Sequence, residues 1–277
     1  MGLRINTNVQ ALAAQRHLGL NHEAQNHSLE RLASGTRIVR AADDAAGLAI
    51  SEKMKSQIRS MRQAERNAND GVSLVQVAEG GMNETGNILT RMRELSIQSA
   101  SDTIGDTERG FINKEVKGLK EEIDRIARST EFNGKKLLDG NSEALDIQVG
   151  IKNNDFEDRF KFNAKNLTST LAALGLEGID NATKEGSQMN LEMLDKAITK
   201  INENRSELGA LKNRLQSTIN NLGIYRENLS AANSRIRDTD IAEETSELTK
   251  NNILSQATVS VLGQANQNAQ VALKLLG

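Results

Sequence analysis

The sequence predicts a mainly α-helical protein: a long antiparallel helical bundle with coiled-coil seams, a small β-hairpin region and paired terminal helices. Proline is absent, so no helix is interrupted by that residue. Aromatic residues make up only 2% of the chain, fewer than a compact core of this size normally carries. The apolar residues are instead mostly aliphatic, and they recur at steps of three and four, which is typical of seams between long helices.

The first predicted element is a terminal helix, followed by a linker, within residues 1–43. Ile5, Val9 and Leu12 begin an apolar stripe that continues to about Leu32. The pair Ser34-Gly35 is turn-like and ends the helical pattern.

Residues 44–129 are predicted to form the N-terminal long helices of the bundle. Asp43 and Asp44 precede the first of them, where carboxylates can accept hydrogen bonds from free backbone N–H groups. The pattern continues to about Ala100, and a shorter helix follows a loop at 102–106. Each glycine inside the long helix costs about 1 kcal/mol relative to Ala, and we expect these positions to let neighbouring helices approach closely: Gly71, Gly80, Gly81 and Gly86.

Residues 130–187 are predicted to form a β-hairpin and connecting region. Leu145, Ile147 and Val149 alternate with polar residues, which is the period of a half-buried strand. Turn-forming sequences such as Phe132-Asn133-Gly134 lie nearby. From about 167 to 186 the pattern favours no particular element.

A third long seam predicts the C-terminal bundle helix over 188–236. Its steps alternate between three and four, as in a left-handed coiled coil, if polar residues fill the positions between the apolar ones. The apolar positions are Leu191, Leu194, Ile198, Ile201, Leu208, Leu215, Ile219, Leu222, Leu229 and Ile236, and the polar ones are Arg205, Lys212, Arg226 and Asn233. Most simply, this seam belongs to an internal core.

A break at Arg237-Asp238-Thr239 precedes the second terminal helix, within 237–277, and Asp240 with Glu243 fits a capping arrangement. A helix with one apolar stripe must cover it, and isolated helices are marginal in water. Two terminal helices offer each other little core, so we expect neighbouring copies of the chain to cover the rest. The candidate packing residues are Ile5, Val9, Leu12, Leu248, Val259, Leu262, Ala269, Leu273 and Leu276.

Composition and motifs argue against several classes of function. The formal net charge of −2, without a basic stripe interleaved with aromatics, argues against nucleic-acid binding. The absence of Cys excludes disulfides and Cys-ligated zinc. His17, His22 and His27 follow one another at steps of five, so they point apart on a helix and do not converge on a metal. With no phosphate loop and no nucleophile elbow, we expect no catalytic site, no metal and no cofactor.

No run of residues is long and apolar enough to insert into a membrane. The first residues contain no continuous apolar segment of the kind that a cleaved signal peptide carries. If the protein is exported, we therefore expect a route that does not use such a signal.

Several segments resemble bacterial flagellin, and the likeness spans nearly the whole chain. ERLASGTRIVRAADDAAGLAISEKM (30–54) is similar to the N-terminal signature of that family, and RNANDGVSLVQVAEGGMNETGNILTRMRELSIQSAS (66–101) to its long core helix. STEFNGKKLLDG (129–140) and IQVGIKNND (147–155) resemble the start of its hairpin region. SRIRDTDIAEETSELTKNNILSQATVSVLGQANQ (234–267) resembles its C-terminal signature.

Two departures from the family pattern are visible. Many flagellins carry a large variable insertion in the middle, whereas here the hairpin region leads almost directly to the C-terminal helices, which predicts a short form with reduced or absent outer domains. Members often have a proline near the C-terminus, and here Ala269 lies in that neighbourhood.

The resemblance implies a structural subunit that self-assembles into the extracellular helical filament of the bacterial flagellum and serves motility. It implies export in an unfolded state through the flagellar type III channel, a flagellar export chaperone, and hook-associated and cap proteins as partners. A membrane sheath around the filament is left open. The alternatives are the hook–filament junction protein, which shares the terminal helices, and a secreted binding module for host receptors.

By the same resemblance, Arg91, Leu95 and Glu115 occupy positions that pack between protofilaments and are recognised by a Toll-like immune receptor of a host. Thr90 stands where Gln is frequent in the family. From the residues alone, Arg91, Arg93 and Glu94 are most simply a solvated helix face.

Overall fold

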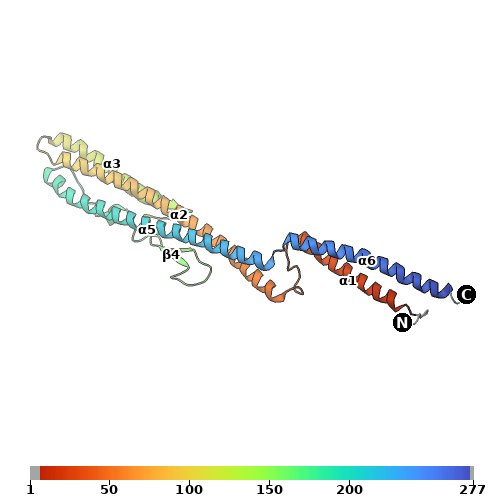
Figure 1. Cartoon of the computed structure of the whole chain (residues 1–277). Helices are drawn as coiled ribbons and strands as arrows, with labels where there is room; N and C mark the ends of the chain where they lie inside the picture. Colours follow the sequence, from red (N-terminus) through yellow and green to blue (C-terminus); the bar gives the residue numbers. More distant parts are fainter. Residues whose placement is uncertain (1–6, 275–277) are drawn as a thin grey trace. The chain divides into compact units, whose positions relative to one another are not determined.

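The computed structural model describes residues 7–274, and the side chains of residues 7–267. In this range the chain forms six helices and two pairs of short antiparallel strands (Figure 1). The helices are α1 (Val9–Ser34), α2 (Ala45–Ser99), α3 (Asp106–Ser129), α4 (Leu171–Leu174), α5 (Lys184–Arg237) and α6 (Ile241–Lys274). The chain divides into two compact units, one of residues 1–58 with 227–277 and the other of residues 59–226, and α2 and α5 contribute to both. The predicted mainly helical fold with a small hairpin region is confirmed.

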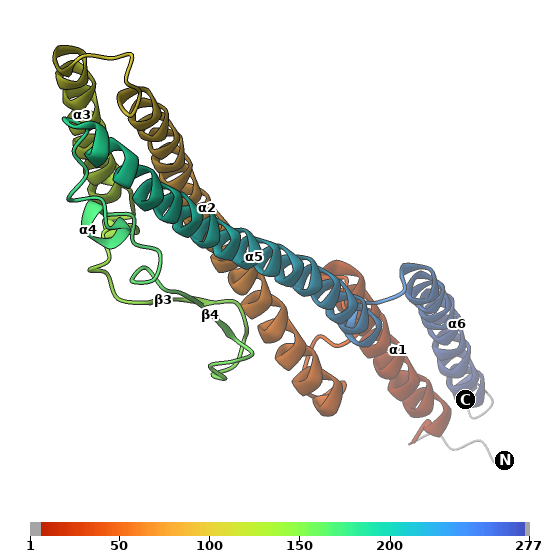
Figure 2. The same cartoon turned by 90° about the vertical axis from the view of Figure 1, so that its left-hand side faces the viewer.

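In the second unit, α2, α3 and α5 pack lengthwise around two hydrophobic clusters (Figure 2). The apolar stripe of α3 faces inward, since Val116 and Ile123 are fully buried. They meet Leu89 and Met92 of α2 and Leu194 of α5, all fully buried as well. Aliphatic side chains thus fill the narrow space between the helices, as the low aromatic content predicts.

The hairpin region contains two separate strand pairs. β1 (Glu131–Phe132) and β2 (Lys135–Lys136) are joined by Asn133 and Gly134, which both have positive φ, as a two-residue type I′ turn requires. β3 (Leu145–Gln148) pairs with β4 (Arg159–Phe162), with Leu145 opposite Phe162. Phe162 is 1% exposed and belongs to the hydrophobic cluster that includes α2 and α5 residues. The strands therefore close one part of the bundle core.

Two of the four glycines predicted to allow close packing in α2 do so. A Cβ atom on Gly81 would lie 2.7 Å from Thr130 Oγ1 and 2.9 Å from Leu138 Cδ1. A Cβ atom on Gly71 would lie 2.9 Å from Ile147 Cδ1. By contrast, a Cβ atom on Gly80 would have no other atom within 4 Å. A Cβ atom on Gly86 would lie 3.8 Å from its nearest neighbour, which is an ordinary van der Waals distance.

The buried seam of α5 differs in part from the predicted one. Leu194, Ile201, Leu208 and Leu215 are fully or almost fully buried, but the positions between them are filled by other residues than expected. Ala197 and Asn204, which follow Leu194 and Ile201 by three residues, are buried. Arg205 and Lys212 are only half-buried. Lys212 instead reaches Glu79 of α2, with 3.8 Å between Nζ and Oε2. The reason is that α5 faces two helices and the hairpin, so its inward side is broader than a two-helix stripe.

The region that the sequence left open, before α5, is held by a buried polar network around Asn181, which is 0% exposed. Its Nδ2 donates to Ser96 Oγ at 3.0 Å, and its carbonyl accepts from Ser99 Oγ at 2.9 Å. Its backbone N–H donates to Asn113 Oδ1 at 3.2 Å. Because buried polar groups need such partners, this network fixes how the connection joins α2 and α3.

Candidate assembly surface

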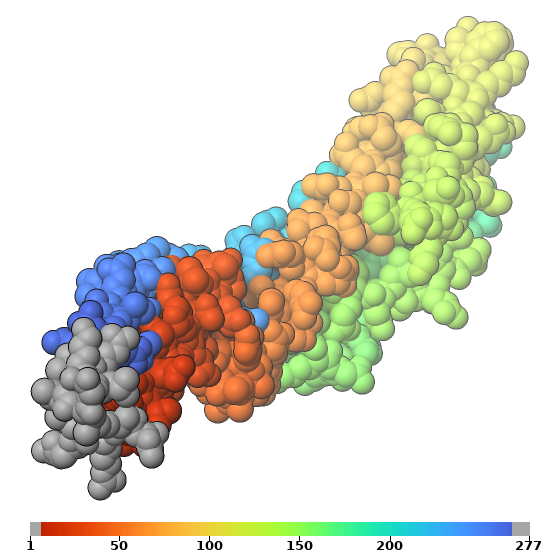
Figure 3. Space-filling view, turned by 90° about the vertical axis from the view of Figure 1, so that its right-hand side faces the viewer, coloured from red at the N-terminus to blue at the C-terminus, as the bar shows by residue number. Residues whose placement is uncertain are grey.

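Helices α1 and α6 of the first unit pack lengthwise as an antiparallel pair (Figures 1 and 3). Near the start of α1, Asn8 Nδ2 donates to the carbonyl oxygen of Ala265 at 2.9 Å. Near its end, Arg31 NH1 lies 3.5 Å from Glu244 Oε2. These contacts at the two extremities fix the register of one helix along the other.

The seam between α1 and α6 has coiled-coil spacing, but it is unusually polar. Asn21 Nδ2 donates to Thr258 Oγ1 at 3.1 Å, and Gln25 Nε2 donates to Asn252 Oδ1 at 2.6 Å. The buried and half-buried residues that follow alternating steps of three and four are Ala11, Ala14, Leu18, Asn21, Gln25, Ser28 and Leu32 on α1, and Glu244, Leu248, Asn251, Ser255, Thr258, Leu262 and Ala265 on α6. Polar residues at such positions specify register at a cost in stability, so this seam aligns the helices more than it buries apolar surface.

Many of the larger aliphatic side chains of the pair lie on its outside. Val9 is 64% exposed, Leu12 58%, Ile253 61% and Val259 52%. On an ordinary soluble helix pair these would be the residues that face inward. Much of the apolar surface of this pair is therefore left uncovered within one copy of the chain.

The structure places the predicted packing residues in different surroundings. Leu248 and Leu262 are half-buried at the seam, whereas Val9, Leu12 and Val259 are exposed. Thr258, four residues before Leu262, takes the seam position. Val259 follows it and points about 100° away, so it lies beside the seam and not in it. Ile5 and Leu276 lie outside the described residues, and Ala269 and Leu273 lie where side chains are not described.

A groove of about 500 Å³ runs along one flank of the pair. Its lining combines alanines of both helices, two aliphatic side chains of α6 and several polar side chains. Its lining residues are Gln10, Ala13, Ala14, His17, Leu254, Ala257, Thr258, Val261, Gln264 and Ala265.

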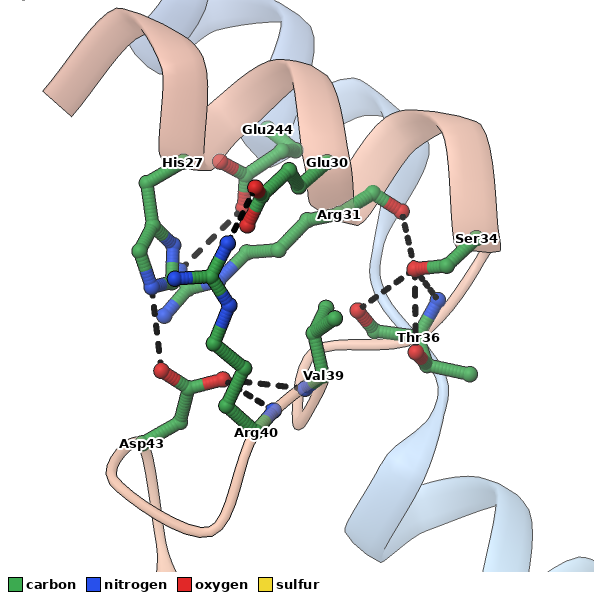
Figure 4. Close-up of polar contacts among 9 residues, drawn as sticks. All are labelled: His27, Glu30, Arg31, Ser34, Thr36, Val39, Arg40, Asp43 and Glu244. Carbon is green, nitrogen blue, oxygen red and sulfur yellow. Dashed lines mark hydrogen bonds and ion pairs between the residues drawn. The ribbon is translucent and has the colours of Figure 1, made fainter. Parts of the chain in front are cut away.

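At the end of α1, the linker folds back onto the helix around Asp43 (Figure 4). Asp43 Oδ2 accepts hydrogen bonds from the N–H groups of Val39 and Arg40, each at 2.9 Å, and Oδ1 lies 3.0 Å from His27 Nε2. The N–H of Arg40 makes the largest contribution to lowering the pKa of Asp43 from 3.8 to about 2, and the N–H of Val39 and the His27 side chain add to it. Arg40 also pairs with Glu30. The linker is thus tied to the last turns of α1.

The linkers after α1 and before α6 also pair with each other. The N–H of Arg37 donates to the carbonyl of Arg237 at 2.6 Å, and that of Thr239 donates to the carbonyl of Gly35 at 3.1 Å. Gly35 has a φ of 68° and ends α1 in the left-handed conformation. Asp240 then begins α6, because its Oδ1 accepts from the N–H of Ala242 at 2.8 Å. Sequence periodicity carries no signal for this contact between distant linkers.

In the second unit, Arg91 of α2 and Glu115 of α3 form an exposed ion pair, with Arg91 Nε and NH2 at 3.1 and 3.0 Å from Glu115 Oε1. Arg91 NH1 also lies 3.2 Å from Glu94 Oε2, and hydrogen bonding, first of all to Glu115, raises the pKa of Arg91. Leu95 does not share this surface. It is 3% exposed and packs in the core beneath the pair, so its expected place on a contact surface is corrected.

Within residues 7–274, no group of three or more His, Cys, Asp or Glu side chains is placed to hold a metal ion. Over the same range, no helix has the length and apolar character needed to span a membrane.

Comparison with known proteins identifies the family. The model of the bacterial flagellin N-terminal helical region matches residues 5–143, and that of the C-terminal helical region matches residues 191–276. A flagellin of Halalkalibacterium halodurans is 45% identical over 98% of this chain and 99% of its own length. A flagellin of Bacillus subtilis is 44% identical over 99% of this chain and 100% of its own length.

Among solved structures, Bacillus cereus flagellin is 31% identical, with a TM-score of 0.50 over 57% of this chain and 88% of that chain. The near-complete coverage of the H. halodurans protein agrees with the predicted short form. The chain therefore belongs to the bacterial flagellin family and is a structural subunit of the flagellar filament.

Proposed function

We propose that α1 and α6 join copies of the chain into the filament by burying their exposed aliphatic side chains against neighbouring subunits. The observation that carries this proposal is the arrangement of the pair. Polar and small residues outnumber leucines at its seam, while Val9, Leu12, Ile253 and Val259 are more than half exposed. Full burial of one such side chain contributes about 1.5–3 kcal/mol. Several of them covered at once offset much of the free energy that association costs.

In this proposal, the five predicted packing residues whose side chains the structure describes divide into two roles. The exposed ones contact neighbouring subunits directly, whereas Leu248 and Leu262 hold the two helices in the register that presents them. Residues 1–43 and 237–277 form the filament core, as concentric layers around a central channel. Residues 44–129, 130–187 and 188–236 form the long helices and the hairpin of the surrounding bundle domain.

Arg91 and Glu115 form a contact between protofilaments in the same proposal. Their side chains are 51% and 46% exposed, which leaves the charges accessible to a neighbouring copy. The same surface is the proposed site for a Toll-like receptor of a host. Leu95 supports both contacts from beneath, since it packs in the core.

Before assembly, the uncovered aliphatic surface of α6 needs protection, and a flagellar export chaperone that binds this helix supplies it. Hook-associated and cap proteins contact the chain at the ends of the filament. We propose that the protein is exported unfolded through the type III channel and carries no catalytic activity.

Deletion of residues 241–277 tests the assembly role. The truncated protein is expected to remain soluble and largely helical by circular dichroism but to form no filaments in electron micrographs, while the full chain assembles under the same conditions. Filaments of normal appearance from the truncated protein would contradict the proposal.

A further inference from the structure

The α1–α6 pair has two long sides, or flanks, on either side of its seam, and they differ in shape over the same stretch of the helices. One flank carries the groove at Ala13 and Ala257, and the other carries the exposed side chains of Leu12 and Val259. We infer that copies of the chain pack flank to flank, with Leu12 and Val259 of one copy entering the groove of the next. This inference rests on the proposed assembly through the terminal helices and adds which surface meets which.

Helix geometry sets the two flanks apart. Consecutive residues of a helix point about 100° apart, so Leu12 and Ala13 lie on either side of the inward-facing residues Ala11 and Ala14. On α6, Ala257 and Val259 lie in the same way on either side of the inward-facing Thr258. Since Ala13 and Ala257 line one groove, Leu12 and Val259 belong to the opposite flank.

The groove has room for the projecting side chains. The groove volume of about 500 Å³ lies in the range of about 300–1,000 Å³ that takes up a bound molecule of several carbon atoms. The alanines in its lining leave room, and Leu254 and Val261 offer aliphatic contact. Two branched aliphatic side chains fit this space and bring no polar group of their own into it.

The charge pattern identifies the occupant as another copy of this chain. The sequence has no charged residue between Lys250 and Lys274, nor between Arg4 and Arg16. A flank without charge offers nothing to a nucleic acid, an anionic lipid surface or a charged peptide. It does suit an equally uncharged flank that carries exposed aliphatic side chains, and the side with Leu12 and Val259 is one.

The proposed contact also accounts for an open polymer. A groove that receives a different surface of the next copy makes a head-to-tail interface, which continues indefinitely unless the rotation between copies closes a ring. A groove that met another groove would stop at a dimer.

Cysteine cross-linking tests the contact, and the chain contains no cysteine to interfere. We would compare the double variants Leu12→Cys/Ala257→Cys and Val259→Cys/Ala13→Cys with the four single variants, each assembled into filaments and then mildly oxidised. A disulfide needs Cα atoms about 4.4–6.8 Å apart. We expect a ladder of covalent oligomers from a double variant and no cross-link from any single variant. Oxidation of dilute, unassembled double variants should give no oligomers.

A mixture of the single variants Leu12→Cys and Ala257→Cys provides a matched control, because it can form covalent dimers but no longer products. Filaments of both double variants that give no covalent oligomers would overturn the inference while leaving the proposed function intact. A dimer from Ala257→Cys alone would overturn it in favour of groove-to-groove pairing. Failure of the unaltered chain to form filaments would instead count against the proposed function.

Discussion

Asp43 and His27 join the linker to the end of α1, with 3.0 Å between Asp43 Oδ1 and His27 Nε2. The other carboxylate oxygen of Asp43 accepts hydrogen bonds from two backbone N–H groups of the linker itself. One ionised side chain therefore shapes the turn and attaches it to the preceding helix.

This arrangement predicts acid sensitivity. The N–H of Arg40 contributes most to a folded-state pKa of about 2 for Asp43, below the ordinary value of 3.8. A lowered pKa means that ionised Asp43 stabilises the fold fully above about pH 4 and that this contribution is lost as the pH falls towards about 2. Asp43→Asn should lower the thermal midpoint at pH 7 and reduce the difference between midpoints at pH 7 and pH 2. Thermal melts followed by circular dichroism check this, with Glu121→Gln on α3 as control, and an unchanged midpoint at pH 7 would refute it.

Two adjacent glycines of α2 should respond to alanine in opposite directions. Gly80→Ala replaces a poor helix former where no atom lies within 4 Å of the new methyl group, so it should stabilise the fold by about 0.5–1 kcal/mol. Gly81→Ala brings the same gain but pushes a methyl group against Thr130 and Leu138, and overpacking of this kind costs about 1–3 kcal/mol. Urea unfolding of the two variants measures the difference. If both stabilise equally, the close contact at Gly81 is not rigid.

Leu262→Asp should abolish filament formation. Leu262 lies half-buried at the α1–α6 seam. An unpaired carboxylate that is buried at such a position costs on the order of several kcal/mol, because it loses its hydration. Leu262→Met keeps nearly the same volume and should assemble, since such exchanges cost less than about 1.5 kcal/mol. Swimming and electron microscopy of strains that carry each variant provide the comparison. Normal motility with Asp at this position would argue strongly against a packed seam.

Arg91→Ala should separate assembly from stability. The side chain is 51% exposed, and surface ion pairs of this kind contribute about 0–1 kcal/mol, so the melting temperature of the monomer should hardly change. Filament yield should nevertheless fall if Arg91 contacts a neighbouring protofilament. Arg93→Ala, which removes an exposed pair with Asp195, is the matched control and should leave the yield unchanged. Equal yields from the two variants would remove Arg91 from the proposed contact.

The helices and the hairpin region could be predicted from the sequence because strong local signals mark them. Glycine and Asp or Asn residues at the breaks end and begin the helices, as Gly35 and Asp240 do. The stripe of α3 also faces inward as its period predicts. Such signals depend on neighbours within one or two turns, and a single sequence contains them completely.

Contacts between distant segments could not be predicted in the same way. Periodicity places Leu95 and Val259 on helices, but only the packing of other helices decides that Leu95 is buried and Val259 exposed. Asn204, which lies in the buried seam of α5, looks like a surface residue when judged by polarity alone. The hydrogen bonds around Asn181 join segments far apart in the chain, so no local pattern announces them.

The unlike flanks of the terminal pair bear on how fast a filament starts and how fast it lengthens. Two free copies that meet can use only one flank each, and that small contact must offset an association cost of about 4–15 kcal/mol. A copy that arrives at an existing tip finds several neighbours at once. New filaments should consequently appear only after a lag, and fragments of finished ones added as seeds should remove it.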